Sequence, residues 1–150
     1  MATKYQQGLY TLKNPYKYLG DASKVRFMSS WELQVFNYMD NNPNVIKWSS
    51  EEVAITYLKP TDNRLHKYYP DILVLYRDNT GVEKWELIEI KPKAQTKPSR
   101  AKSPKVRLYQ NITLAVNMAK FAAAQQWCEA QQANGISVTF RILTENQIFK

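Results

Sequence analysis

The stretch "ELIEIKPK" (residues 86–93) decides the interpretation of this sequence, because it ends a run of strand-forming residues with an acid, a base and a proline. Side chains two residues apart on a strand project from the same face, so Glu89 and Lys91 should lie side by side. Pro92 cannot donate a hydrogen bond to a sheet and therefore marks the exit from the strand. The strand is expected to end in a charged pair held at a loop boundary.

A second predicted strand supplies another charged end. The apolar run of "YYPDILVLY" starts directly after Pro70 and Asp71, and the turn formers of "RDNTG" separate it from "VEKWELIEIK". If the turn centres on residues 78–81, paired positions in this hairpin sum to roughly 159, which places Asp71 opposite Ile88 or Glu89. Two carboxylates would then meet at the open end of the hairpin. Like charges there destabilise a sheet unless a cation lies between them.

This arrangement predicts a metal site. Mg²⁺ binds one or two carboxylates and keeps water and substrate phosphate as further ligands. Lys91, one step along the same face, would neutralise charge on a scissile phosphate or orient the attacking water. The alternative is a cross-strand Glu–Lys pair beside a solvated Asp. We favour the metal site because residues 71–76 and 87–90 are apolar on both faces, which is typical of central strands.

Hydrophobic periodicity predicts the remaining elements of one domain. The expected order is helix, three strands, helix and strand, at residues 30–41, 51–58, 68–76, 82–91, 106–133 and 136–143, with a helical turn at 144–149. This order predicts an α/β fold with a mixed central sheet flanked by helices. We expect residues 1–28, which are aromatic and basic without periodicity, to form an extended arm, and residues 29–150 to form a single domain.

The charge distribution predicts a polyanionic partner. Twenty-one Lys and Arg residues against thirteen acids give a net charge of +8, and no acid occurs between residues 90 and 128. The arm and the loop 92–107 are expected to grip a nucleic-acid backbone without reading bases. The alternative is a solvated loop that keeps the protein in solution. The basic side chains concerned are Lys93, Lys97, Arg100, Lys102, Lys105 and Arg107.

Composition also excludes several classes of protein. No apolar run approaches the ~20 residues of a membrane span, and residues 1–20 lack the apolar block of a signal peptide. A single cysteine, Cys128, and a single histidine, His66, exclude an internal disulfide and a Cys/His zinc site. We therefore expect an intracellular protein that uses neither a membrane nor a small-molecule cofactor.

The pattern of Pro70-Asp71 followed by Glu89-Ile90-Lys91, in this order of elements, resembles the PD-(D/E)XK nuclease superfamily, whose fold is restriction-endonuclease-like. With "SSWE", "HKYYPD" and the Lys/Pro-rich loop added, most of residues 26–145 are similar to the head completion nucleases of large contractile-tailed phages. Those nucleases are related to TnsA-type endonucleases.

The resemblance implies roles for particular residues. Asp71 and Glu89 would hold Mg²⁺, for which Mn²⁺ would substitute, together with the backbone carbonyl of Ile90. Glu32 in the first helix would complete the acidic site, and Lys91 would be catalytic. The reaction would be cleavage of double-stranded DNA during or after genome packaging. The resemblance implies phage head, portal or neck proteins as partners, with the protein in the virion and, during assembly, in the host cytoplasm.

Several alternatives stay open. A DNA-binding structural protein of the phage head or neck could keep this fold without catalysis. A TnsA-type nuclease of a transposition complex is disfavoured, since such proteins usually carry a further C-terminal domain and this chain ends at residue 150. Glu32 also fits a capping box with Ser29 as N-cap. His66 could act as a general base, but we expect it to be a surface residue. Asn117 and Lys120 could contact phosphate, but we expect them to serve packing and solubility.

Overall fold

The structure is a computed structural model that describes residues 7–148. Its strands are β1 (Gly8–Leu9), β2 (Arg26–Phe27), β3 (Val45–Ser50), β4 (Ile55–Lys59), β5 (Arg64–Tyr68), β6 (Ile72–Arg77), β7 (Glu83–Ile90) and β8 (Val138–Leu143). Its α-helices are α1 (Ser30–Asn41), α2 (Pro104–Ala133) and α3 (Glu145–Ile148), and short 3-10 turns are η1 (Pro15–Lys17), η2 (Ala22–Lys24) and η3 (Lys93–Thr96).

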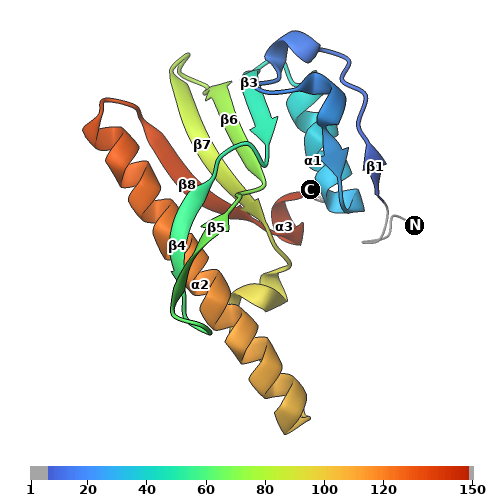
Figure 1. Cartoon of the computed structure of the whole chain (residues 1–150). Coiled ribbons are helices and arrows are strands. Elements are labelled where there is room, and N and C mark those ends of the chain that lie inside the picture. The colour runs from blue at the N-terminus through green and yellow to red at the C-terminus, as the bar shows by residue number, and fades with distance from the viewer. Residues whose placement is uncertain (1–6, 149–150) are drawn as a thin grey trace.

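The central sheet has the strand order β3-β6-β7-β8 (Figure 1). The pairs β3–β6 and β6–β7 are antiparallel, whereas β8 runs parallel to β7. The predicted α/β fold with a mixed central sheet is therefore confirmed. β6 and β7 occupy the middle of the sheet, which explains why both of their faces are apolar.

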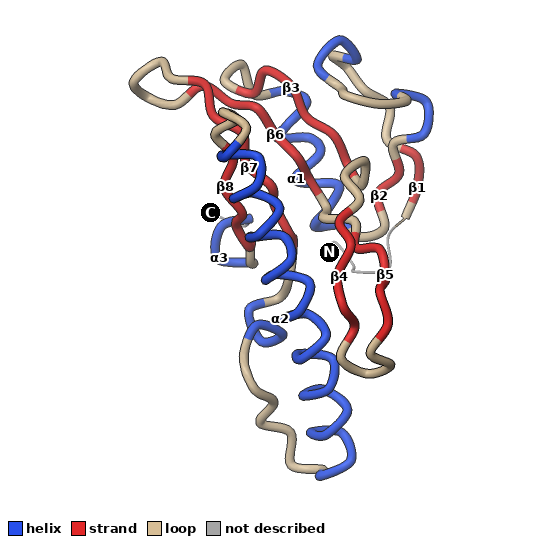
Figure 2. Tube along the Cα trace, turned by 60° about the vertical axis from the view of Figure 1, so that its left-hand side comes forward, coloured by secondary structure: helices blue, strands red, loops and turns tan. Residues whose placement is uncertain are grey.

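The two long helices cover opposite faces of this sheet (Figure 2). Ile72, Val74 and Ile88 pack with α1, whereas Leu87 packs with Phe121 of α2. Because successive side chains on a strand alternate between faces, neighbouring residues of β7 belong to different cores. The strand ends are thereby held rigidly between two packed layers.

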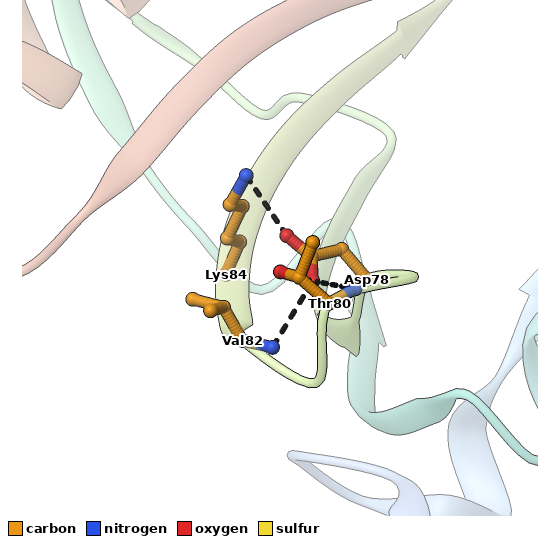
Figure 3. Close-up of polar contacts among 4 residues, drawn as sticks. All are labelled: Asp78, Thr80, Val82 and Lys84. Atoms are coloured by element: carbon orange, nitrogen blue, oxygen red, sulfur yellow. Dashed lines mark hydrogen bonds and ion pairs between the residues drawn. The ribbon is translucent and has the colours of Figure 1, made fainter.

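A side-chain network closes the turn between β6 and β7 (Figure 3). Asp78 Oδ1 accepts hydrogen bonds from the backbone N–H groups of Thr80 and Val82, at 2.9 and 3.0 Å, and from the Thr80 hydroxyl at 2.6 Å. Lys84 Nζ lies 3.0 Å from Asp78 Oδ2. Gly81 supplies the positive φ, 83°, that the turn requires. These contacts set the register of the hairpin, because turn geometry fixes which residues pair beyond it.

The first strand of the central sheet after α1 is not the strand that the sequence predicted. β3 occupies that position, whereas β4 pairs with β5 in a separate hairpin beside α2. Trp48 of β3 is fully buried, but the polar residues around it hide the apolar alternation. The alternation of residues 53–57 is real, yet it marks a strand of the peripheral hairpin.

The prediction of an extended arm is wrong for residues 7–28, which pack against α1. Asp40, fully buried near the end of α1, accepts hydrogen bonds from the Tyr10 hydroxyl at 3.0 Å and from the backbone N–H groups of Lys13 and Asn14 at 2.8 and 2.9 Å. Lys17 is buried and donates to backbone carbonyls at the end of α1. Irregular segments show no periodicity even when their aromatic side chains are buried. Residues 1–6 of the proposed arm lie outside the described residues.

Helix α2 begins at Pro104, two residues before its predicted start, with Ser103 as its N-cap. Lys105 and Arg107 therefore lie on its first turns rather than in a loop. Its N-terminal half extends beyond the sheet (Figure 1). Within the described part of the chain, no helix combines the length and apolarity needed to cross a membrane.

Candidate active site

The charged strand ends meet at one end of the central sheet. Asp71 directly precedes β6, Glu89 and Ile90 end β7, and Lys91 follows. The ladder pairs Ile72 with Ile88, so the next position outward places Asp71 opposite Glu89. The neighbouring strands hold both segments: the Glu51 N–H donates to the Asp71 carbonyl at 3.2 Å, and the Lys91 N–H donates to a carbonyl at the end of β8 at 3.0 Å.

Asp71 is tied directly to the opposite strand. Its Oδ2 accepts a hydrogen bond from the Ile90 N–H at 2.7 Å, which leaves Oδ1 for another ligand. Burial raises the pKa of the Asp71 carboxyl well above its ordinary range, and the negative charge of Glu89 raises it further. The two carboxylates therefore repel each other in the absence of a cation.

Glu89 is the least exposed acid of the site, with 6% of the residue exposed. Its Oε1 accepts a hydrogen bond from the Tyr68 hydroxyl at 2.6 Å, and its Oε2 lies 3.6 Å from Lys91 Nζ. Burial raises the pKa of Glu89, whereas the Tyr68 hydrogen bond and the Lys91 charge oppose that rise. The Lys91 contact confirms that the two side chains share a face of the strand end.

Glu32 makes the capping contacts that its sequence context predicts. Its backbone N–H donates to Ser29 Oγ at 3.1 Å, and its Oε1 accepts from the Met28 N–H at 3.0 Å, one residue before the expected partner. Burial raises the pKa of Glu32, and the charges of Glu51 and Glu89 contribute to the rise. Glu32 therefore caps α1 and also faces the acidic site, so its metal role stays a prediction.

The donor set fits a metal that needs few protein ligands. Within residues 7–148, no group of three or more His, Cys, Asp or Glu side chains is arranged to hold a metal ion. Asp71 and Glu89 nevertheless form a pair of carboxylates with one oxygen each free of the hydrogen bonds from Ile90 and Tyr68. Mg²⁺ commonly uses one or two carboxylates plus water and phosphate, so this pair suits Mg²⁺ better than a metal held wholly by protein.

The predicted DNA-binding side chains lie beyond the site, along η3, the following loop and the start of α2. All six are exposed, and none forms an ion pair with an acid of the described residues. The loop is held against α2, since the Ser99 N–H donates to Asn111 Oδ1 at 2.7 Å and Arg107 donates to the Ala101 carbonyl at 3.1 Å. The basic segment therefore has a defined conformation, and its exposed positive charges are available to bind phosphates.

Two site residues escaped the sequence analysis, and a third was given another role. Tyr68 reaches Glu89 from the end of β5, and Lys120 of α2 places its Nζ 5.7 Å from the centre of the Tyr68 ring. Glu51, just after β3, has a positive φ of 55° and raises the pKa of Glu32 through its charge. The only sequence signal for Tyr68 was its position in "HKYYPD", three residues before Asp71. Lys120, which we assigned to packing and solubility, faces the site.

His66 lies away from these residues. Its Nε2 is 2.7 Å from Asp62 Oδ2 within the β4–β5 hairpin. This contact agrees with the expectation that His66 has a surface role.

Comparison with known proteins defines the class. Residues 42–145 match the family model for the N-terminal domain of TnsA-like endonucleases. The chain therefore belongs to the TnsA-like endonuclease family, and it is a nuclease. It is 35% identical over 145 residues to the head completion nuclease of Enterobacteria phage T4, an alignment that covers 93% of this chain and 91% of the relative. The resemblance that the strand-end residues indicated is confirmed.

Proposed function

We propose that this protein is an Mg²⁺-dependent endonuclease that hydrolyses phosphodiester bonds of double-stranded DNA in phage head completion. The observation that carries the proposal is the Asp71–Glu89 pair, which faces Lys91 at the ends of the two central strands. The name of the T4 relative supports a role in head completion, and the family model supports endonucleolytic cleavage.

Asp71 and Glu89 would hold Mg²⁺ with the Ile90 carbonyl, and Glu32 would contribute a further acidic oxygen. When bound, the ion supplies Lewis-acid activation of water and of the phosphate oxygen; Mn²⁺ would substitute for it. Lys91 Nζ, kept beside Glu89 Oε2 at 3.6 Å, would stabilise the negative charge that develops on the scissile phosphate. The chain thus provides metal ligands and one positioned cation on the same strand.

The exposed basic segment would position the DNA. Its six Lys and Arg side chains lie in η3, in the following loop and at the start of α2, and they would contact phosphates of the DNA backbone beside the site. Because these contacts involve phosphates and not base edges, binding should depend strongly on salt and little on sequence.

We further propose that phage head, portal or neck proteins direct this activity, in the virion or in the host cytoplasm during assembly. The support is the name of the T4 relative, together with a net charge of +8 that favours a protein working on DNA.

Nicking of supercoiled plasmid tests the proposal. Wild type should nick plasmid in Mg²⁺ and lose activity in EDTA, whereas Glu89→Ala should be inactive. Glu86→Ala is a matched control, since Glu86 lies on the same strand but pairs with Arg141 at 3.0 Å on the other face. A wild-type protein that binds plasmid yet leaves it intact with Mg²⁺ and with Mn²⁺ would instead favour a non-catalytic DNA-binding protein of the head.

A further inference from the structure

Tyr68 holds one specific oxygen of a proposed metal ligand. Its hydroxyl donates to Glu89 Oε1 at 2.6 Å, the short distance typical of a hydrogen bond to a charged acceptor. The other oxygen, Oε2, is the one that lies beside Lys91 Nζ. The two oxygens of Glu89 are therefore not equivalent: Oε1 faces a phenol, and Oε2 faces the predicted reaction centre.

The surrounding side chains prevent the Tyr68 ring from moving. Tyr68 is 5% exposed, and its ring packs edge-on against Tyr57, with ring centres 6.5 Å apart. Lys120 Nζ lies 5.7 Å from the Tyr68 ring and 5.8 Å from the Tyr57 ring, within range of cation–π attraction. The β4–β5 hairpin and α2, which are far apart in the chain, thus meet at this tyrosine. A hydroxyl held so firmly also restricts rotation of the carboxylate that it contacts.

We propose that Tyr68 is a positioning residue that makes Glu89 bind a divalent cation through Oε2 alone, and that it thereby favours Mg²⁺ over Ca²⁺. The inference rests on the proposed metal-dependent function. It goes beyond that function by assigning the choice of metal to a side chain that is not itself a ligand.

The physical reason lies in the different coordination of the two ions. Mg²⁺ is small and requires near-octahedral geometry, whereas Ca²⁺ takes six to eight oxygens and readily accepts both oxygens of one carboxylate. A hydrogen bond on Oε1 withdraws charge from that oxygen and holds the plane of the Glu89 carboxylate. Contribution of both oxygens is then disfavoured, so the site offers Ca²⁺ fewer oxygens than it prefers. Outer contacts of this kind commonly tune metal ligands.

A purely structural role for Tyr68 predicts a different result. If the hydroxyl only satisfied a buried carboxylate, its loss would change stability and weaken both metals equally. If it restricts Glu89 as proposed, its loss frees Oε1 and improves Ca²⁺ binding relative to Mg²⁺. The ratio of the two dissociation constants separates these roles, because it cancels a uniform loss of affinity.

The experiment compares wild type with Tyr68→Phe and with Tyr57→Phe. Tyr68→Phe removes the hydroxyl on Glu89 and keeps the ring against Tyr57 and Lys120. Tyr57→Phe removes a hydroxyl from the same buried cluster without touching the Glu89 bond. Mg²⁺ and Ca²⁺ are each titrated into the DNA-free protein by calorimetry. The rise of Tm with each ion provides a second measurement, which works even if a variant is less stable.

We expect the ratio of the Ca²⁺ to the Mg²⁺ dissociation constant to fall roughly tenfold in Tyr68→Phe, the size associated with losing a hydrogen bond to a charged group. Tyr57→Phe should keep the wild-type ratio. An unchanged ratio in Tyr68→Phe overturns the inference and leaves the proposed nuclease intact, provided that wild type binds Mg²⁺. A wild type that binds neither ion and cleaves nothing overturns the inference and the proposed function together.

Discussion

The Asp71 carboxylate accepts the backbone N–H of Ile90 across the two central strands, at 2.7 Å. This hydrogen bond links the residue before β6 to the last residue of β7, just beyond the final β6–β7 pair of Ile72 and Ile88. A slip of one residue would turn Glu89 to the opposite face of the sheet, because side chains alternate with a period of two. The bond therefore holds the two carboxylates and Lys91 on one side of the molecule.

Asp71→Asn should abolish cleavage while preserving the fold. The amide oxygen can still accept the Ile90 N–H, but the neutral side chain is a poor metal ligand. Loss of a metal ligand removes several kcal/mol of transition-state stabilisation, so we expect at least a roughly hundredfold fall in kcat. Plasmid nicking with saturating Mg²⁺ measures the rate, and thermal unfolding checks the fold. Near wild-type nicking by this variant would remove Asp71 from the site.

The metal-free protein should become less stable as pH rises from about 4 towards 7. Burial and Glu89 raise the pKa of Asp71 above its ordinary 3.8, so the folded state binds a proton more tightly than the unfolded state does. Stability is then lost as pH rises past 3.8 and the folded carboxyl is forced to ionise. Each unit of pKa difference corresponds to about 1.4 kcal/mol.

Urea unfolding in EDTA at several pH values tests this dependence. Asp71→Asn should reduce this dependence to the part that the raised pKa values of Glu89 and Glu32 contribute, and saturating Mg²⁺ should reverse it by stabilising the ionised pair. Asp78 has a lowered pKa and stabilises the fold only when ionised, so its contribution is lost below pH 3.8, outside this range. A wild-type stability that is flat between pH 4 and 7 without metal would contradict the assigned carboxylate repulsion.

Glu32→Gln separates the two roles of Glu32. The glutamine can still accept the Met28 N–H, so thermal stability should hardly change. If Glu32 helps to hold the metal, the variant should need more Mg²⁺ for half-maximal cleavage, and we expect this result. Unchanged activity across a Mg²⁺ titration would restrict Glu32 to the helix cap.

Ser29→Ala is the complementary variant. It removes the oxygen that accepts the Glu32 N–H and should cost about 1 kcal/mol of stability. Its Mg²⁺ requirement should stay at the wild-type value, because the carboxylate is unchanged. Together, Glu32→Gln and Ser29→Ala test whether the Ser29 hydroxyl sets the stability of the helix start and the Glu32 carboxylate sets the Mg²⁺ requirement.

Neutralising four basic residues together should weaken DNA binding without changing its sequence preference. With Lys97, Arg100, Lys102 and Lys105 replaced by Gln, the slope of log K against log salt should flatten by roughly 3 to 4, near one unit for each lost phosphate contact. Arg77→Gln is the control, since Arg77 is exposed at the other end of β6 from the site. Binding that keeps the wild-type salt slope would show that this segment is a solvated spacer.

The sequence by itself determined the central hairpin and its charged ends. Turn residues at Asp78 and Gly81, and the period of two along each strand, are local signals, and they were enough to place Glu89 beside Lys91 and close to Asp71. The helices at 30–41 and 104–133 followed from equally local periodicity, with one start displaced by two residues.

Only the tertiary structure decided which elements surround that hairpin. Nothing local to "VIKWSS" shows that β3 lies beside β6, or that residues 7–28 pack against α1. Tyr68 reaches Glu89, and Lys120 reaches the Tyr68 ring, because Tyr68 of β5 and residues of α2 belong to the same core on one face of the sheet. Such contacts depend on which apolar faces cover one another across the whole chain, and a periodicity read within one segment carries no information about its distant partner.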